Sequence, residues 1–211
     1  MTRANTKQQL LEATLKLISE KGYLGATTRE IAQEAGVTEL TLFRHFGSKE
    51  RLFEELLNSY TVLPKLKELL PELRNTSYEH ALELIAMRVL LTLKERKAMI
   101  KIMYTEVTIY PEKIRAVYNR FVDEVRATLA GFFEAMQRRG ALTHCSPEMA
   151  AKVFLWILFS YFRSEEIMRP GGMKKESVEK QVREIIEIFM HGTVNQGVDI
   201  VKEGRRVHER V

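Results

Sequence analysis

Residues 27–53, TTREIAQEAGVTELTLFRHFGSKERLF, place the strongest constraint on how this chain can fold. Thr27 is followed three residues later by Glu30, which is the spacing of a capping box and predicts that a short helix begins there. Gly36 then allows a tight turn that would strain any residue with a Cβ atom. The segment therefore predicts a short helix that ends in a glycine turn.

A second helix is predicted directly after this turn. Thr38 can cap a helix that starts at Glu39, and Val37 and Leu42 occupy the two positions of a hydrophobic staple. Two short helices joined by a glycine turn form a helix-turn-helix, whose second helix lies in the DNA major groove. On the helix signals alone, a purely structural helical hairpin is an equally good interpretation.

The same segment resembles the N-terminal DNA-binding domain of the TetR family of transcriptional regulators. The resemblance covers residues 6–53 approximately and rests on a dense set of positions: Thr28, Ile31, Ala32, Ala35, Gly36, Val37, Thr38, Leu42, His45, Phe46, Lys49 and Leu52. It implies a three-helix DNA-binding domain, a larger helical domain for a small-molecule effector and a homodimer. Beyond this segment the chain resembles the family only in length and helical layout.

Two positions depart from the family pattern. Leu40 stands where the family often has glycine, and Phe43 stands where it usually has tyrosine. A tyrosine hydroxyl would reach a DNA phosphate. Losing that contact should weaken DNA binding without changing the sequence preference, because phosphate contacts position the protein while base contacts specify the sequence.

The candidate DNA contacts follow from the resemblance and from the predicted recognition helix. They are Thr28, Arg29, Thr38, Glu39, Thr41, Phe43, Arg44, His45 and Lys49. Arg44 is the candidate for reading a guanine, since a guanidinium can bond both O6 and N7; a phosphate contact is the equal alternative. Lys49, at the start of the next helix, is expected to grip a phosphate together with free backbone amides, and the alternative is a solvated side chain.

Three of these residues have a second interpretation. Thr41 can touch a thymine methyl group or a phosphate, and His45 can brace the domain or contact DNA. Glu39 would repel phosphate unless it accepted a hydrogen bond from cytosine N4. We favour a role for this carboxylate at the positive end of its helix dipole.

Composition sets limits on the class of protein. The chain has 211 residues, 45% of them hydrophobic, and a net charge of +5, which suits a nucleic-acid partner. Residues 1–50 hold seven Lys/Arg against six Asp/Glu, by count of the sequence. A sequence-neutral DNA-packaging protein needs a larger basic surplus than this, so DNA binding is expected to depend on where the charges lie.

Several features indicate a cytoplasmic protein without metal, cofactor or membrane segment. Cys145 is the single cysteine, which excludes an internal disulfide and fits a reducing compartment. The first ten residues lack the apolar run of a signal peptide. The most apolar stretch, residues 150–162, carries Lys152 and is too short to span a bilayer. His144 and Cys145 are adjacent without further ligands at metal spacing, so a loop pair is favoured over a zinc site.

The remaining sequence predicts an all-α protein of about nine helices, divided into a DNA-binding domain at residues 1–50 and an effector-binding and dimerisation domain at residues 51–211. One helix from Lys49 to Leu63 is expected to link them as a lever about 22 Å long, ending or bending at Pro64. Residues 104–110, YTEVTIY, alternate like a strand but are too isolated to build a sheet.

The expected effector is apolar or aromatic. Its candidate contacts are Met87, Met99, Met103, Tyr104, Glu106, Tyr118, Arg120, Phe121 and Trp156. Methionine is deformable and suits a permissive apolar pocket, whereas for any single apolar residue ordinary core packing is the better interpretation.

The last two long helices are expected to form a two-fold dimer. They carry more apolar residues than one subunit's core is expected to use: Val153, Phe154, Ile157, Phe159, Tyr161, Ile185 and Phe189. No glycine-rich phosphate loop, nucleophile elbow or H-E-x-x-H motif occurs, which argues against a helical-scaffold enzyme. The sequence therefore predicts a ligand-responsive repressor that binds a palindromic operator and is released by its effector.

Overall fold

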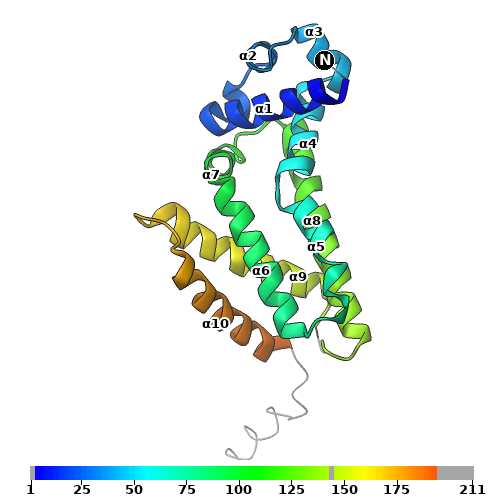
Figure 1. Ribbon diagram of the computed structural model, residues 1–211, viewed down its shortest axis with the longest axis vertical. Coiled ribbons are helices and arrows are strands. Elements are labelled where there is room, and N and C mark those ends of the chain that lie inside the picture. Colours follow the sequence, from blue (N-terminus) through cyan, green and yellow to red (C-terminus); the bar gives the residue numbers. More distant parts are fainter. Residues whose placement is uncertain (1–2, 143–144, 194–211) are drawn as a thin grey trace, which may run out of the picture.

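The computed structural model describes residues 3–142 and 145–193, and every regular element within these ranges is helical (Figure 1). The elements are α1 (Arg3–Gly25), α2 (Thr28–Glu34), α3 (Glu39–Phe46), α4 (Lys49–Tyr60), α5 (Val62–Leu69), the 3-10 helix η1 (Glu72–Asn75), α6 (Tyr78–Glu95), α7 (Lys97–Glu106), α8 (Glu112–Arg138), α9 (Pro147–Phe162), the π-helix η2 (Arg163–Met168) and α10 (Lys175–Thr193). The all-α prediction is confirmed, and residues 104–110 form a helix end and a turn.

The helices build an elongated molecule with α1–α3 at one end and α9 and α10 towards the other (Figure 1). Two apolar cores lie along its length. One core joins α1–α4 to buried residues of α7 and of the first turns of α8, such as Met99 and Val117. The second core lies among α5, α6, the rest of α8, α9 and α10. Helix α8 contributes to both, and Phe121 packs against each of them.

The lever helix expected from Lys49 to Leu63 is divided in two, which accounts for ten α-helices in the described ranges instead of about nine. Helix α4 ends at Tyr60, Thr61 is extended (φ −111°, ψ −164°), and α5 begins at Val62. Pro64 explains the break, because proline has no N–H to bond the carbonyl four residues earlier and its ring clashes with that group. The freed carbonyl of Tyr60 accepts a hydrogen bond of 3.1 Å from Nε of Arg96 instead.

A buried carboxylate fastens the turn between α9 and α10. Glu166, in η2, is 5% exposed and accepts hydrogen bonds from Nζ of Lys97 at 2.8 Å and from the backbone N–H of Met173 at 2.7 Å. Gly172 (φ 62°) leaves room for this carboxylate, since a Cβ there would lie 2.7 Å from a Glu166 carboxylate oxygen. Burial acts to raise the pKa of Glu166, but the bonds from Lys97 and Met173 and the charge of Lys94 outweigh it and lower the pKa.

The expectation that Phe154 and Phe189 belong to a subunit interface is wrong. Phe154 is 0% and Phe189 is 4% exposed within a single chain, and their ring centroids lie 5.0 Å apart in the second core. Both residues lie on the inner sides of α9 and α10. Other apolar residues of the same two helices, such as Phe159 and Ile188, lie on the outer sides. The apolar character of a stretch did not reveal which side faces the core.

Replacing Phe189 with Ala should lower the free energy of unfolding by about 3–5 kcal/mol, because the change leaves a cavity among packed rings. The neighbouring Glu187 is exposed, so Glu187→Ala should change the same quantity by less than about 0.5 kcal/mol. Urea unfolding of both variants measures the difference. Equal costs for the two variants would contradict the placement of Phe189 in the core.

Candidate DNA-binding site

Helix α2 begins as the sequence predicts. The side-chain oxygen of Thr27 accepts a hydrogen bond of 3.2 Å from the backbone N–H of Glu30, and Oε2 of Glu30 accepts one of 3.1 Å from the N–H of Thr27. The capping box is therefore confirmed. Lys21 adds a salt bridge of 2.7 Å to the same carboxylate, and this bond together with those from Thr27 lowers the pKa of Glu30 to about 2.

The glycine turn and the start of α3 are also confirmed. Gly36 has φ 68°, in the left-handed region that favours glycine. The N–H of Val37 donates to the carbonyl of Ala32 at 2.9 Å, which closes the end of α2. Thr38 is extended and its side-chain oxygen accepts a hydrogen bond of 3.2 Å from the N–H of Thr41. The segment is a helix-turn-helix.

Helix α3 has one buried and one exposed side. Leu42 and Phe46 are 0% and 5% exposed and anchor the helix to the core of α1–α4. Leu40 is 79% exposed, Phe43 is 41% exposed, and Arg44 beside Phe43 is exposed as well. The exposed side thus presents two apolar groups and a guanidinium at helical spacing, which is the mixture of groups that reads base edges in a major groove.

Some predicted DNA contacts are bonded to one another. Oγ1 of Thr28 donates to Glu39 at 2.6 Å, which ties the start of α2 to the start of α3, and the hydroxyls of Thr38 and Thr41 lie 2.9 Å apart. Arg29 is exposed, and His45 is half-buried with its ring 6.2 Å from that of Phe46. The Thr28–Glu39 pair braces the two helices and leaves Arg29 and Arg44 directed to solvent.

Lys49 lies against the end of α1 instead of extending into solvent. Its Nζ donates to the carbonyl of Tyr23 at 2.5 Å and lies 4.3 Å from the centroid of the Tyr23 ring. Burial lowers the pKa of Lys49, and the nearby carboxylate of Glu106 acts in the opposite direction. An ammonium has three protons to donate, so one bond to a carbonyl leaves two for another acceptor.

Glu106, at the end of α7, is bonded to the DNA-binding end of the molecule. Its Oε2 accepts a hydrogen bond of 2.8 Å from the backbone N–H of Tyr23. The N–H is accessible because Gly22 interrupts α1 with φ 76° and ψ 174°, a combination that is essentially restricted to glycine. A Cβ at Gly22 would lie 1.9 Å from Oε1 of Glu106, so the glycine also makes room for the carboxylate.

Aromatic rings surround the contact between Tyr23 and Glu106. We call the group of residues that meet here the Tyr23 junction: Gly22, Tyr23, Lys49, Glu106 and Tyr110. The Tyr23 ring lies 4.9 Å from that of Phe53 in α4 and 5.8 Å from that of Tyr110, which precedes α8. Burial raises the pKa of both tyrosines. The junction therefore joins α1, α4, α7 and the start of α8 through packed rings and two hydrogen bonds.

The predicted effector contacts do not share one cavity. Met99 and Met103 are buried in the core of α1–α4, and half-buried Tyr118 and Phe121 of α8 pack against this core. Met87 is half-buried at the edge of the second core.

The polar and exposed members of that set also have other partners. The Tyr104 hydroxyl accepts a hydrogen bond of 2.8 Å from Arg163, and Arg120 forms a salt bridge of 3.5 Å with Glu54. Trp156 is 54% exposed, with Lys152 over its ring. A hollow of about 490 Å³ lies in a different part of the C-terminal half, between α5 and α8.

Within the described ranges, no group of three or more His, Cys, Asp and Glu residues is placed to hold a metal ion. His144 lies outside these ranges, and Cys145 is half-buried. No helix in the described part of the chain is long and apolar enough to cross a membrane.

A helix-turn-helix carried on a larger helical domain defines a DNA-binding transcriptional regulator. Residues 10–56 match the model of the bacterial regulatory proteins of the tetR family, and residues 70–192 match that of the AefR-like transcriptional repressor C-terminal domain. The chain belongs to the TetR family of transcriptional regulators. Members of this family are not enzymes, which agrees with the sequence prediction.

Individual relatives are similar over most of their length. The HTH-type transcriptional regulator YvkB of Bacillus subtilis is 31% identical over 157 residues, which cover 74% of this chain and 81% of that protein. The nucleoid occlusion factor SlmA of Edwardsiella ictaluri is 24% identical, covering 80% and 89%. A solved TetR-family regulator from Mesorhizobium loti superposes with a TM-score of 0.74 at 24% identity, covering 92% of this chain and 100% of that one.

Two features of this end of the molecule could not be predicted from the sequence. Leu40 departs from the family pattern, and in the structure it adds an exposed apolar surface on the outer side of the recognition helix. The carboxylate of Glu106 beside Gly22 was also not foreseen, because the two residues are 84 positions apart in the sequence.

Replacing Gly22 with Ala should lower the free energy of unfolding by at least about 1–3 kcal/mol, the usual cost of a strained backbone conformation, with the clash against Glu106 added. In a Glu106→Ala background the same change should cost less, because the atoms that the new Cβ would meet are absent. Denaturant unfolding of the four proteins of this cycle measures both costs. Gly140→Ala (φ 75°, no atoms within 4 Å) is the control for positive φ without a clash.

Proposed function

We propose that the chain is a cytoplasmic homodimeric repressor that binds a palindromic operator and is released when an apolar or aromatic small molecule binds its C-terminal domain. In this proposal residues 1–50 bind DNA, and residues 51–211 bind the effector and the second subunit. The observation that carries the proposal is the exposed side of α3, where Leu40, Phe43 and Arg44 lie free of the core.

The proposed reading of DNA divides the exposed groups by chemistry. Arg44 bonds O6 and N7 of a guanine, while Leu40 and Phe43 contact thymine methyl groups. Arg29, Thr38, Thr41 and the remaining protons of Lys49 contact phosphates and fix the position of α3 in the groove. Thr28, Glu39 and His45 act indirectly, by holding α2 and α3 together. The hydrogen bond of 2.6 Å from Thr28 to Glu39 supports this role.

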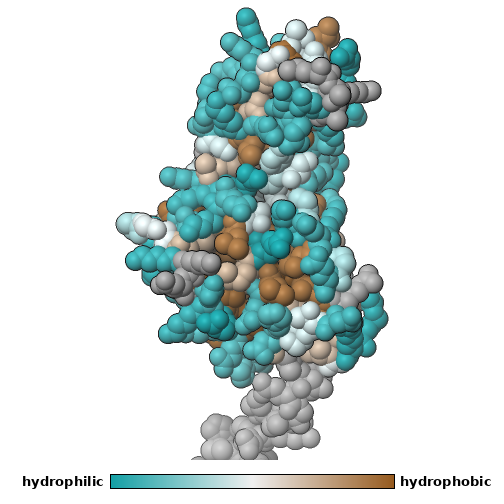
Figure 2. Space-filling model, viewed as in Figure 1, coloured by the Kyte–Doolittle hydropathy of each residue, from teal (hydrophilic) through white to brown (hydrophobic). Residues whose placement is uncertain are grey.

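The proposed dimer contact lies on the outer sides of α9 and α10. Trp156 and Phe159 in α9 are 54% and 42% exposed, and Ile188 in α10 is 73% exposed. Exposed apolar residues that gather on neighbouring helices mark an interaction surface, and two-fold pairing is its commonest closure. On the face shown in Figure 2, the end with α1–α3 is mostly hydrophilic, and apolar residues gather in the C-terminal half.

The proposed release mechanism runs through the Tyr23 junction and the bent α4–α5 lever. Helix α4 has 12 residues, about 18 Å at 1.5 Å per residue, so an effector in the C-terminal half cannot compete with DNA directly. Movement of α5 or α7 is transmitted to α1–α3 because Thr61 and Glu106 connect them. Only an effector that prefers one arrangement can shift the equilibrium, and operator DNA must weaken effector binding by the same factor.

Selection from random DNA should yield a palindrome whose half-sites are about one helical turn, near 34 Å, or a multiple of it apart. Arg44→Ala should weaken operator binding by about 1–3 kcal/mol and relax the preference at one base pair in each half-site. Titration of operator and unrelated DNA measures both effects.

Lys49→Ala is the comparison for that experiment, since a lost phosphate contact weakens all sequences alike and reduces the salt dependence. If Arg44→Ala weakened operator and unrelated DNA by equal factors, Arg44 would be a phosphate contact. Equal affinity of the unaltered protein for operator and unrelated DNA would overturn the proposal of a sequence-specific repressor.

Replacing Ile188 with Arg should convert the dimer to a monomer while each subunit stays folded, because the side chain is exposed in a single chain and a charge would be buried without a partner in the dimer. Analytical ultracentrifugation gives the mass, and far-UV circular dichroism monitors folding. A monomeric unaltered protein at micromolar concentration would contradict the dimer.

A further inference from the structure

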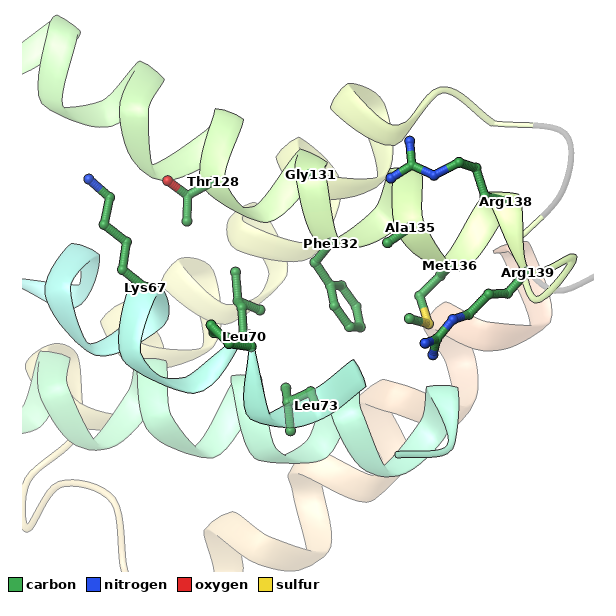
Figure 3. A pocket seen from close by; sticks show the side chains of 11 residues that line it. Lys67, Leu70, Leu73, Thr128, Gly131, Phe132, Ala135, Met136, Arg138 and Arg139 are labelled. Atoms are coloured by element: carbon green, nitrogen blue, oxygen red, sulfur yellow. The ribbon is translucent and has the colours of Figure 1, made fainter. Parts of the chain in front are cut away.

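A groove of about 490 Å³ lies between α5 and η1 on one side and the C-terminal part of α8 on the other (Figure 3). Its floor is apolar and belongs to the second core: Leu73 is 2%, Phe132 is 7% and Met136 is 3% exposed. Half-buried Leu70 forms its α5 side. The volume falls within the range of small-molecule sites, about 300–1,000 Å³, and the floor can cover an apolar body.

The charged residues that line the groove are all cations. Lys67 lies at one end and Arg138 and Arg139 at the other, and the lining contains no carboxylate (Figure 3). Lys67 forms a salt bridge of 2.6 Å with Glu124, and Arg138 forms one of 2.8 Å with Glu134. Among the described residues Arg139 has no such partner, and in Figure 3 its side chain extends from α8 across the end of the groove.

Gly131 widens the groove in the interior of α8. Glycine is a poor residue for the middle of a helix, and a packed neighbour would normally explain it. A Cβ at Gly131 would meet no atom within 4 Å, so nothing in the described chain requires a glycine there. The residue lines the groove opposite Leu70, where its missing side chain leaves room for a bound molecule.

We propose that this groove binds an amphipathic anion: a molecule with a single carboxylate, sulfonate or similar head group and an unbranched apolar body. The head bonds the guanidinium of Arg139, which can engage a carboxylate with two parallel hydrogen bonds. The body lies over Leu70, Leu73 and Phe132 and passes Gly131.

This inference rests on the proposed function only in taking the ligand to be the effector. The position of the groove suits that role. A body inserted between α5 and α8 pushes on α5, and α5 is joined to α4 through the extended residue Thr61. Displacement of α5 therefore reaches the α4 helix that packs with the DNA-binding end.

Calorimetric titration of the full-length chain with decanoate and with 1-decanol tests the site. Decanoate should bind at least tenfold more tightly than decanol, because hydrogen bonds to a charged group are stronger than those to a neutral one. Arg139→Gln should weaken decanoate at least tenfold and leave decanol unchanged. Arg138→Gln removes the same charge from a residue that is already paired and should weaken decanoate less than threefold.

Gly131→Leu fills the groove without removing a charge, and leucine is a better helix former than glycine. This variant should remain folded by circular dichroism and lose binding of both molecules. Equal affinities for decanoate and decanol, or decanoate affinity that neither Arg139→Gln nor Gly131→Leu changes, would overturn the proposed site.

A second titration separates the site from its role as an effector site. Decanoate should weaken operator binding by the unaltered protein and not by Arg139→Gln. If decanoate bound with the predicted dependence on Arg139 but left operator affinity unchanged, the groove would stand as an anion site and the effector role would fail. If the protein bound no specific DNA at all, the proposed function would fail while the calorimetric result still decided the site.

Discussion

The packing of Tyr23 is the contact on which the arrangement of this molecule depends. Its backbone bonds Glu106 through the N–H and Lys49 through the carbonyl, and its ring packs between Phe53 and Tyr110. These partners come from α7, α4 and the loop before α8. Tyr23 therefore connects the end of α1 to three parts of the chain that follow the helix-turn-helix.

The DNA-binding end shares its apolar core with α7 and α8. The core of α1–α4 contains buried residues of α7 and α8, including Met103 and Ile114, so the DNA-binding end does not have a core of its own. In the proposed release mechanism, movement between the two ends is therefore expected where a helix is interrupted. Thr61 is such a place, because the helix is broken there and the carbonyl of Tyr60 bonds Arg96 of another element. In the proposed release mechanism, the lever is therefore two helices joined at Thr61 and not one stiff helix.

Features of the fold that depend on residues close together in the sequence could be predicted, whereas features that depend on residues far apart in the sequence could not. The capping box of Thr27 and the turn at Gly36 involve residues within a few positions, so their chemistry could be read directly. The break before Pro64 was expected as an end or bend, but the hydrogen bond from Arg96 to the freed carbonyl of Tyr60 could not be foreseen, because the two residues are 36 positions apart. The inward side of Phe189 could not be predicted, since apolar residues on both sides of a helix look alike until the neighbouring helices are placed.

The buried carboxylate of Glu166 makes one part of this fold sensitive to acid. Its pKa is lowered in the folded chain, so its contribution to stability is present above the pKa of an unfolded glutamate and is lost as the pH falls through the folded value. Protonation would weaken its bonds to Lys97, at the start of α7, and to Met173, before α10. Acid would thus loosen the connection between α7 and the helices α9 and α10, which are proposed to pair the subunits. The other end of α7 carries Glu106, which bonds the N–H of Tyr23.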